Sequence, residues 1–384
     1  MEKIGKNTKQ NRVTTFIDKE LLYSVYGLLT IGVMAVFSAS EFRCVINELN
    51  LMHFLGLHIF WLVAGLIGMF CFAKLDYKKL HKYTFSFALI VLILLLLIKF
   101  TPIGLSVNGA KRWINLGVMS FQPSELAKIS VIMLLASLFS LKTNEFKEKW
   151  LFYISPIFLM IGLIYKQPNL SMTIILLSLC LFMYIFSGKS LKWIALLCSI
   201  GIIFCVFELT GLTHIVFSHI EPYQFSRITN WRHPDADIQG EGYNVYQSLI
   251  AVSSGGMFGD GYGASKAKLG WLPEAHTDFI FSVISEEMGF VFSLLIIGLF
   301  LFILSRGFLI AYRKNDLYGK LLASGITSSI CVQAFFNISV ATAFLPATGI
   351  TLPFISYGGS SLLVSLCMVG ILLNISKRSL NIVR

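Results

Sequence analysis

Long apolar blocks separated by short polar segments dominate this chain. Most blocks are about as long as the roughly 20 apolar residues that an α-helix needs to cross a bilayer. Lipid offers no hydrogen-bond partners to the backbone, so runs of this length must be helical. We therefore predict an all-α, polytopic membrane protein with about ten transmembrane helices, near residues 21–39, 54–73, 84–101, 124–141, 151–165, 172–187, 194–210, 279–305, 321–344 and 358–376.

The composition agrees with this pattern. The 384 residues are 56% hydrophobic and 13% charged, whereas a soluble domain usually has about a quarter of its residues charged. The net charge of +11 does not indicate a nucleic-acid partner, because the cations occupy short loops between apolar blocks. The seven cysteines show no CxxC spacing, and we interpret them as small buried hydrophobes rather than a disulfide framework or a metal site.

The distribution of Lys and Arg predicts the orientation. If the N-terminus is cytoplasmic, about two thirds of the 31 basic residues fall on cytoplasmic segments, as the positive-inside rule requires. We expect cytoplasmic tails at residues 1–20 and 377–384 and a ten-helix membrane domain at 21–376. The chain shows no internal repeat, which weakens the interpretation as an inverted-repeat transporter.

Three segments on the predicted outer face are richer than simple connections. Residues 102–123 form a polar loop with Gly and Pro, and residues 345–361 contain two prolines and paired glycines. The loop of about residues 211–278, before the eighth helix, is far longer than a connector needs to be. Its Trp, Tyr and Gly content favours an ordered, functional loop.

Basic side chains gather on this outer face, against the positive-inside bias. Lys111, Arg112, Lys128 and Lys268 are among them. An anionic lipid headgroup such as a diphosphate would explain them, because Lys and Arg are the usual partners of phosphate oxygens. The alternative is snorkelling of long side chains to the lipid headgroups.

Ionisable residues also enter the predicted spans. Glu125 and Lys128 are three residues apart at the start of a span, so they share a helix face and can neutralise each other. Glu286 and Glu287 lie inside an apolar run and need partners, for which Lys128 is a candidate. Such residues are functional candidates, although a packing ion pair is an equally good interpretation.

Asp278 stands where the long outer loop becomes a span. It could simply be a first-turn residue favoured by the helix dipole. It could instead be a general base, since apolar neighbours such as Phe279 and Phe281 disfavour the charged carboxylate and so strengthen it as a base. His276 nearby evokes a Ser-His-Asp triad, but no G-x-S-x-G elbow is present.

The histidines also raise the possibility of a metal site. Binding by His214, His219, His233 and His276 has no ligand spacing to support it, and the sequence shows no dedicated metal cage.

Several long motifs resemble those of one known family. The segments are GAKRWI (109–114), FQPSELAK (121–128), LPEAHTDFIF (272–281), SEEMG (285–289) and LPATGITLPFISYGGSS (345–361). Together they make the chain similar to the SEDS proteins, named for shape, elongation, division and sporulation, over nearly its whole length. The motif sequences are most similar to those of the division branch, and those of the elongation branch are nearly as similar. Two departures are Asn169, where the family pattern has aspartate, and Gly270, where the family sometimes has an acidic residue.

The resemblance implies an enzyme, a peptidoglycan glycosyltransferase that polymerises lipid II in septal cell-wall synthesis in the bacterial plasma (inner) membrane. It also implies partners. One is a single-pass class B penicillin-binding protein, which is a transpeptidase, and the others are further division proteins. It matches Asp278 to the catalytic aspartate, and Glu125 and Lys128 to a cavity-lining pair. The substrate contacts that we expect are Lys111, Arg112, Glu125, Lys128, Lys268, Glu274, His276 and Ser356.

This chemistry would join a sugar hydroxyl to an anomeric carbon with inversion and release undecaprenyl diphosphate. Asp278 would take the proton, and Arg112, Lys128 and Lys268 would stabilise the diphosphate. A divalent cation, Mg or Mn, could share that task. Two rivals remain: a lipid II flippase, and a non-catalytic scaffold for division proteins.

Overall fold

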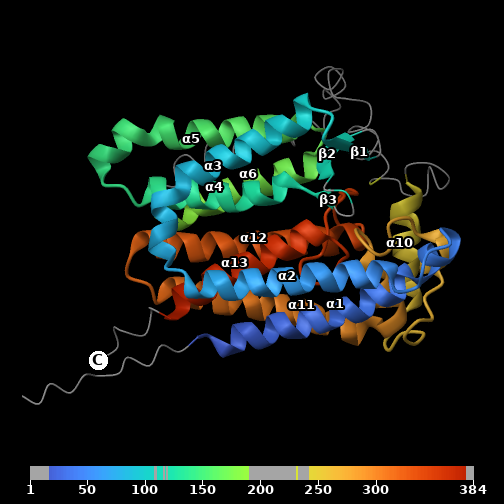
Figure 1. Ribbon diagram of the computed structural model, residues 1–384. Coiled ribbons are helices and arrows are strands. Elements are labelled where there is room, and N and C mark those ends of the chain that lie inside the picture. The colour runs from blue at the N-terminus through green and yellow to red at the C-terminus, as the bar shows by residue number, and fades with distance from the viewer. Residues whose placement is uncertain are drawn as a thin grey trace, which may run out of the picture.

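A computed structural model of the chain describes residues 17–107, 110–115, 117, 120–189, 231 and 242–377. In this part, long helices run side by side (Figure 1), and seven are long and apolar enough to cross a membrane. These seven are α1 (Lys19–Ile46), α2 (His53–Lys74), α3 (Tyr77–Phe100), α5 (Thr143–Tyr165), α11 (Ile280–Tyr312), α12 (Leu317–Ala341) and α13 (Gly359–Lys377).

Two shorter helices complete the bundle: α4 (Pro123–Phe139) and α6 (Leu170–Phe186). The prediction of an all-α, multi-pass fold is confirmed, and nine of the ten predicted spans coincide with a helix in the described residues. The remaining span, 194–210, lies outside them, so the count of ten stays a prediction.

Helix α12 lies in the middle of the bundle. It contacts α4 and α6 on one side and α11 and α13 on the other, so it joins the two groups of helices seen in Figure 1. Most of its apolar window is buried, whereas α2 buries little of its own. Exposed Leu, Ile and Phe side chains on outer helices are suited to hydrocarbon rather than to water.

The two ends of the described chain meet at one end of the bundle. The backbone N–H of Asp18 donates to Ser376 Oγ at 3.3 Å, and Arg306 at the far end of α11 pairs with Asp18 at 2.7 Å. At this same end the chain reaches Lys189, whose ammonium lies 3.3 Å from the ring centroid of Phe146. The chain is next described at Trp231, whose indole N–H donates to Ala343 O at 2.9 Å at the opposite end.

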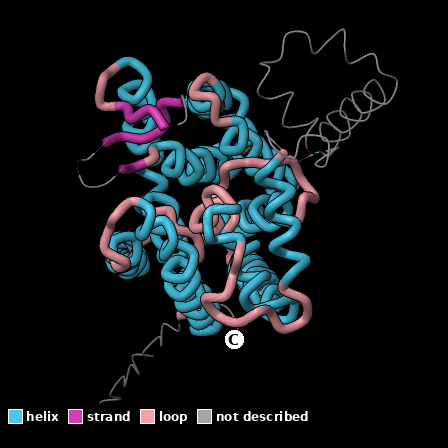
Figure 2. Tube along the Cα trace, turned by 90° about the vertical axis from the view of Figure 1, so that its right-hand side faces the viewer, coloured by secondary structure: helices cyan, strands magenta, loops and turns pink. Residues whose placement is uncertain are grey.

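That opposite end carries the segments predicted to be outside. Residues 102–123, predicted to be a polar loop, contain a small antiparallel sheet in the order β1 (Gly104–Val107), β2 (Ala110–Asn115) and β3 (Ser120–Phe121). The later part of the long loop contains α10 (Tyr243–Ser254) and the one-turn helix η2 (Ala267–Trp271). Figure 2 views the bundle from this end, with the strands at one edge. Residues 211–230 and 232–241 of the predicted loop lie outside the described residues.

Candidate functional site

Asp278 lies in the turn that leads into α11, at the end of the bundle that carries the sheet. Its backbone N–H donates to Glu274 O at 3.1 Å, and its side chain is partly exposed. The next residue, Phe279, and Phe281 are 5% and 2% exposed, which anchors the turn in the core. The turn therefore holds the carboxylate of Asp278 in a fixed position at the rim of the bundle.

The segment around Asp278 is held by three consecutive backbone carbonyls. Each accepts one hydrogen bond from α12 or from the loop between α12 and α13. The bonds are Tyr357 N to His276 O at 2.9 Å, Ser356 Oγ to Thr277 O at 2.6 Å, and Asn337 Nδ2 to Asp278 O at 2.7 Å. Ser356, which we expected to contact substrate, is 3% exposed and serves in the structure as one of these three donors.

Glu125 and Lys128 form the predicted ion pair. Pro123 begins α4, a position that suits its fixed φ and missing N–H, so both residues fall near the same end of the bundle as Asp278. Lys128 Nζ lies 2.7 Å from Glu125 Oε2, with side chains 0% and 5% exposed. Lys128 Nζ also donates to Gln333 Oε1, a residue of α12 that the sequence analysis missed.

The prediction that Lys128 neutralises Glu286 or Glu287 is wrong. Glu286 accepts from Ser265 Oγ and from the backbone N–H groups of Lys266 and Ala267, at 3.1 and 3.2 Å for the two amides. Its carboxylate is therefore satisfied locally, by the loop before η2.

Lys268 is the cation that neutralises Glu287. Lys268 Nζ lies 3.3 Å from Glu287 Oε1 and 2.9 Å from Ser38 Oγ, and Ser38 Oγ donates to Glu287 Oε1 at 2.5 Å. Glu41 approaches the same ammonium at 3.7 Å. The network joins α1, η2 and α11, and Lys268, 5% exposed, is fully engaged within it.

The neighbouring Gly270 explains one departure from the family pattern. Its φ is +93°, and a Cβ there would lie 2.7 Å from Cε1 of Phe42. Glycine adopts this backbone conformation without steric cost, so a side chain at this position would strain the η2 turn.

Glu274 and His276 lie beside Arg43 in the last turn of α1. Arg43 Nη1 is 3.4 Å from Glu274 Oε2 and 3.3 Å from His276 Nε2. Burial, and then the charge of Arg43, lower the pKa of His276 to about 4, while Glu274 opposes the shift. The His276 ring is therefore neutral at neutral pH and packs against Phe54.

Arg112 and Lys111 lie on β2. Arg112 Nε donates to Gln167 O at 3.2 Å, and its Nη2 donates to Pro168 O, which ties the sheet to the turn between α5 and α6. Lys111 is exposed and pairs with Ser106 in the sheet register. In that same turn, Asn169 caps α6 by accepting from Met172 N at 3.2 Å, a structural role in place of the acidic residue of the family.

The structure thus brings Ser356, His276 and Glu274 together with Asp278, and Glu125 together with Lys128. Lys268 pairs with Glu287 and lines one pocket together with Arg43, Glu274 and His276. The residues missed from the sequence are Gln333 and Asn337 on α12, the amides that bind to both groups. Two buried amides spaced four apart in an apolar block are costly unless partnered, and that spacing was the available signal.

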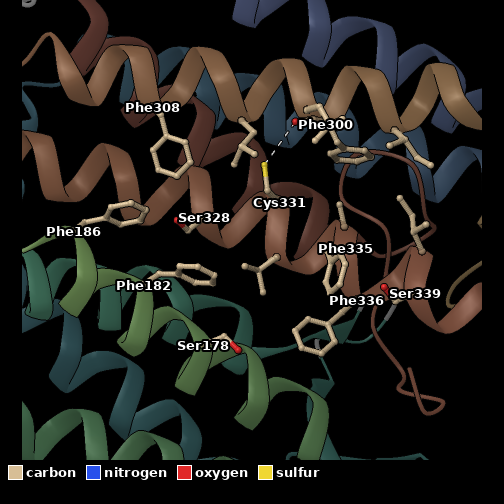
Figure 3. A pocket seen from close by; sticks show the side chains of 16 residues that line it. Ser178, Phe182, Phe186, Phe300, Phe308, Ser328, Cys331, Phe335, Phe336 and Ser339 are labelled. Atoms are coloured by element: carbon tan, nitrogen blue, oxygen red, sulfur yellow. Dashed lines mark hydrogen bonds between the residues drawn. The ribbon is translucent and has the colours of Figure 1, made fainter. Parts of the chain in front are cut away.

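A large apolar cavity lies between α6, α11 and α12 (Figure 3). Its volume is about 780 Å³, and its lining includes Phe182, Phe300, Phe335 and Phe336. The described residues of its wall carry no charged side chain, so this lining suits hydrocarbon.

The described residues contain no group of three or more His, Cys, Asp or Glu side chains arranged to hold a metal ion. Three of the histidines considered above, His214, His219 and His233, lie outside the part of the chain that the structure describes.

The sequence model of a family described as "Cell cycle protein", that of FtsW, RodA and SpoVE, matches residues 19–381. The chain belongs to this family. Stage V sporulation protein E of Bacillus subtilis (strain 168) is 38% identical over 355 residues, covering 92% of this chain and 94% of that protein. The probable peptidoglycan glycosyltransferase FtsW of Trichlorobacter lovleyi is 36% identical over 362 residues, covering 94% and 93%.

Solved structures agree with the family assignment. A chain from a peptidoglycan synthase complex that coordinates polymerization and crosslinking superposes with a TM-score of 0.76 at 26% identity, over 95% of this chain and 99% of that chain. The rod shape determining protein RodA of Thermus thermophilus superposes with a TM-score of 0.65 at 25% identity, over 94% and 96%. The membrane-embedded helical bundle is therefore the shared architecture of the family.

Proposed function

We propose that the chain is a peptidoglycan glycosyltransferase that polymerises lipid II into glycan strands during septal wall synthesis. The main support is a set of relatives named as probable peptidoglycan glycosyltransferases, which match more than nine tenths of the chain at about 35% identity. The geometry supports it: a carboxylate and a buried cation lie at the end of the bundle where a lipid-linked sugar would enter.

The proposed reaction joins two lipid-linked substrates. A hydroxyl of one sugar attacks the anomeric carbon of the other, the bond from that carbon to the diphosphate oxygen breaks, and the linkage inverts. The hydroxyl proton passes to the carboxylate of Asp278 as the new bond forms. The leaving undecaprenyl diphosphate carries the released negative charge, which cations at the rim stabilise.

The described cations differ in how freely they could bind the leaving diphosphate and stabilise its charge. Lys111 is exposed and open to a ligand, whereas Lys268 is held by Glu287 and Lys128 by Glu125. Arg112 donates to backbone carbonyls and would have to exchange them for phosphate oxygens. A divalent cation, Mg²⁺ or Mn²⁺, would arrive with the diphosphate, since such ions commonly bind through substrate phosphates and few carboxylates.

We also propose a setting for the enzyme. The synthase complex among the structural relatives supports a class B penicillin-binding protein as partner, with other division proteins as activators. We expect both chain ends to be cytoplasmic, in the bacterial plasma membrane at the septum. Filamentous cells after depletion would support the division branch, whereas round cells would support elongation, and a spore defect alone would support sporulation.

The test is glycan-strand formation from lipid II by the purified chain with its cognate transpeptidase, the latter made inactive for crosslinking. Wild type is compared with Asp278→Ala and Asp278→Asn, and with Asp260→Asn, which alters an exposed acid in the same outer region. Each variant is first checked for melting temperature and partner binding.

We expect polymer from wild type and Asp260→Asn, and none from either Asp278 variant. Equal polymer from all four would remove Asp278 from the mechanism. Absence of polymer from wild type would favour the rivals, and lipid II movement across a vesicle bilayer would then distinguish a flippase from a scaffold.

A further inference from the structure

Two amides on α12 connect the region of Lys128 to the region of Asp278. Gln333 and Asn337 are four residues apart, so they lie on one face of the helix. They are 2% and 1% exposed. Buried amides that serve packing alone are costly, so the partners that they bind indicate their purpose.

Gln333 binds on one side to the ion pair and on the other to the loop between α12 and α13. Its Oε1 accepts from Lys128 Nζ. Its Nε2 donates to Thr351 O at 3.0 Å and lies within 3.0 Å of Ser361 Oγ. One amide therefore fixes the ammonium relative to the backbone at residue 351.

Asn337 repeats this arrangement one turn further along. Its Nδ2 donates to Asp278 O and to Ile350 O, each at 2.7 Å. Its Oδ1 is buried and accepts no hydrogen bond from the described residues. The adjacent Gly349 lies so close to the carboxylate that a Cβ there would be 3.2 Å from Asp278 Oδ2.

We propose that Gln333 and Asn337 are positioning residues that act together. Through the adjacent loop residues Ile350 and Thr351, they hold Lys128 and Asp278 in a fixed relation. This inference rests on the proposed function, in which the base and the cations serve the same anomeric carbon. Proton removal and stabilisation of the leaving group must then coincide in space, and a displacement near 1 Å can lower a rate about 100-fold.

The experiment measures steady-state polymerisation of lipid II by Gln333→Ala, Asn337→Ala and the double variant, in complex with the partner. Ser324→Ala is the matched control, because among the described residues this buried hydroxyl of α12 bonds only to its own helix, at Lys320 O. We expect kcat to fall about 10–100-fold in each single variant with KM within about twofold, and a lower melting temperature because each deletion leaves buried hydrogen-bonding groups without a partner. If Asn337→Ala does not fold, Asn337→Ser, which keeps a donor for one carbonyl, is measured with the same expectation.

The double variant tests whether the two amides act together. Groups that act as a unit are non-additive, so the double variant should resemble the more impaired single variant. Multiplicative losses, kcat within twofold of wild type, or a loss confined to KM would each overturn the inference. Asp278→Ala is measured in parallel. If it is inactive while the Gln333 and Asn337 variants are normal, only the present inference is refuted. If Asp278→Ala is active, the assignment of Asp278 as the base is refuted.

Discussion

Removing one member of the Glu125–Lys128 pair should destabilise the protein, and removing both charges should restore it. At 2.7 Å and an effective dielectric constant of about 20, the attraction between the two charges is about 6 kcal/mol. Desolvation offsets much of it, so breaking such a buried pair typically costs about 3–5 kcal/mol, while replacing both charges with neutral groups is often neutral.

The variants are Lys128→Met, Glu125→Gln and the double. Thermal unfolding of the purified complex is the assay, and at roughly 2 °C per kcal/mol for a large domain each single variant should melt about 6–10 °C below wild type. The double variant should melt within about 3 °C of wild type. Glycan polymerisation should stay low in Lys128→Met and in the double variant, because neither carries the cation.

Two results would contradict this reasoning. If the double variant melts as low as the single variants, the two charges do not compensate each other. If the double variant is both stable and fully active, the pair serves packing alone and has no part in binding the diphosphate.

Three further predictions concern the Asp278 segment. Gly349→Ala should lower kcat several-fold at an unchanged melting temperature, because its Cβ would press on Asp278 Oδ2 from 3.2 Å. For His276, the folded-state pKa of about 4 lies below the ordinary value of 6.5, so the unfolded state binds more protons between these two pH values. Wild type should therefore lose about 3 kcal/mol of stability as pH falls from 6.5 to 4, and His276→Gln should lose less in melting curves. Gly270→Asp should cost about 1–3 kcal/mol, and addition of Phe42→Ala, which clears the 2.7 Å contact, should recover part of it in the same assay.

The sequence alone determined the helices and the local pairs. Apolar runs in lipid have one way to satisfy their backbone, so the spans followed from length, and α4 and α11 begin within a residue or two of their predicted starts. The Glu125–Lys128 contact followed from its spacing of three, because helix geometry alone places such residues together. The motifs that indicated the family were equally local.

Only the tertiary structure decided which distant polar groups meet. Glu287 pairs with Lys268 rather than Lys128, and Arg112 binds the turn after α5, because these contacts depend on how separate helices and loops are aligned. The partners of the amides Gln333 and Asn337 lie on α4, in the turn before α11 and in the loop after α12. Helical periodicity specifies the face on which a side chain lies, but the register between helices is set by packing over the whole bundle, which no single segment encodes.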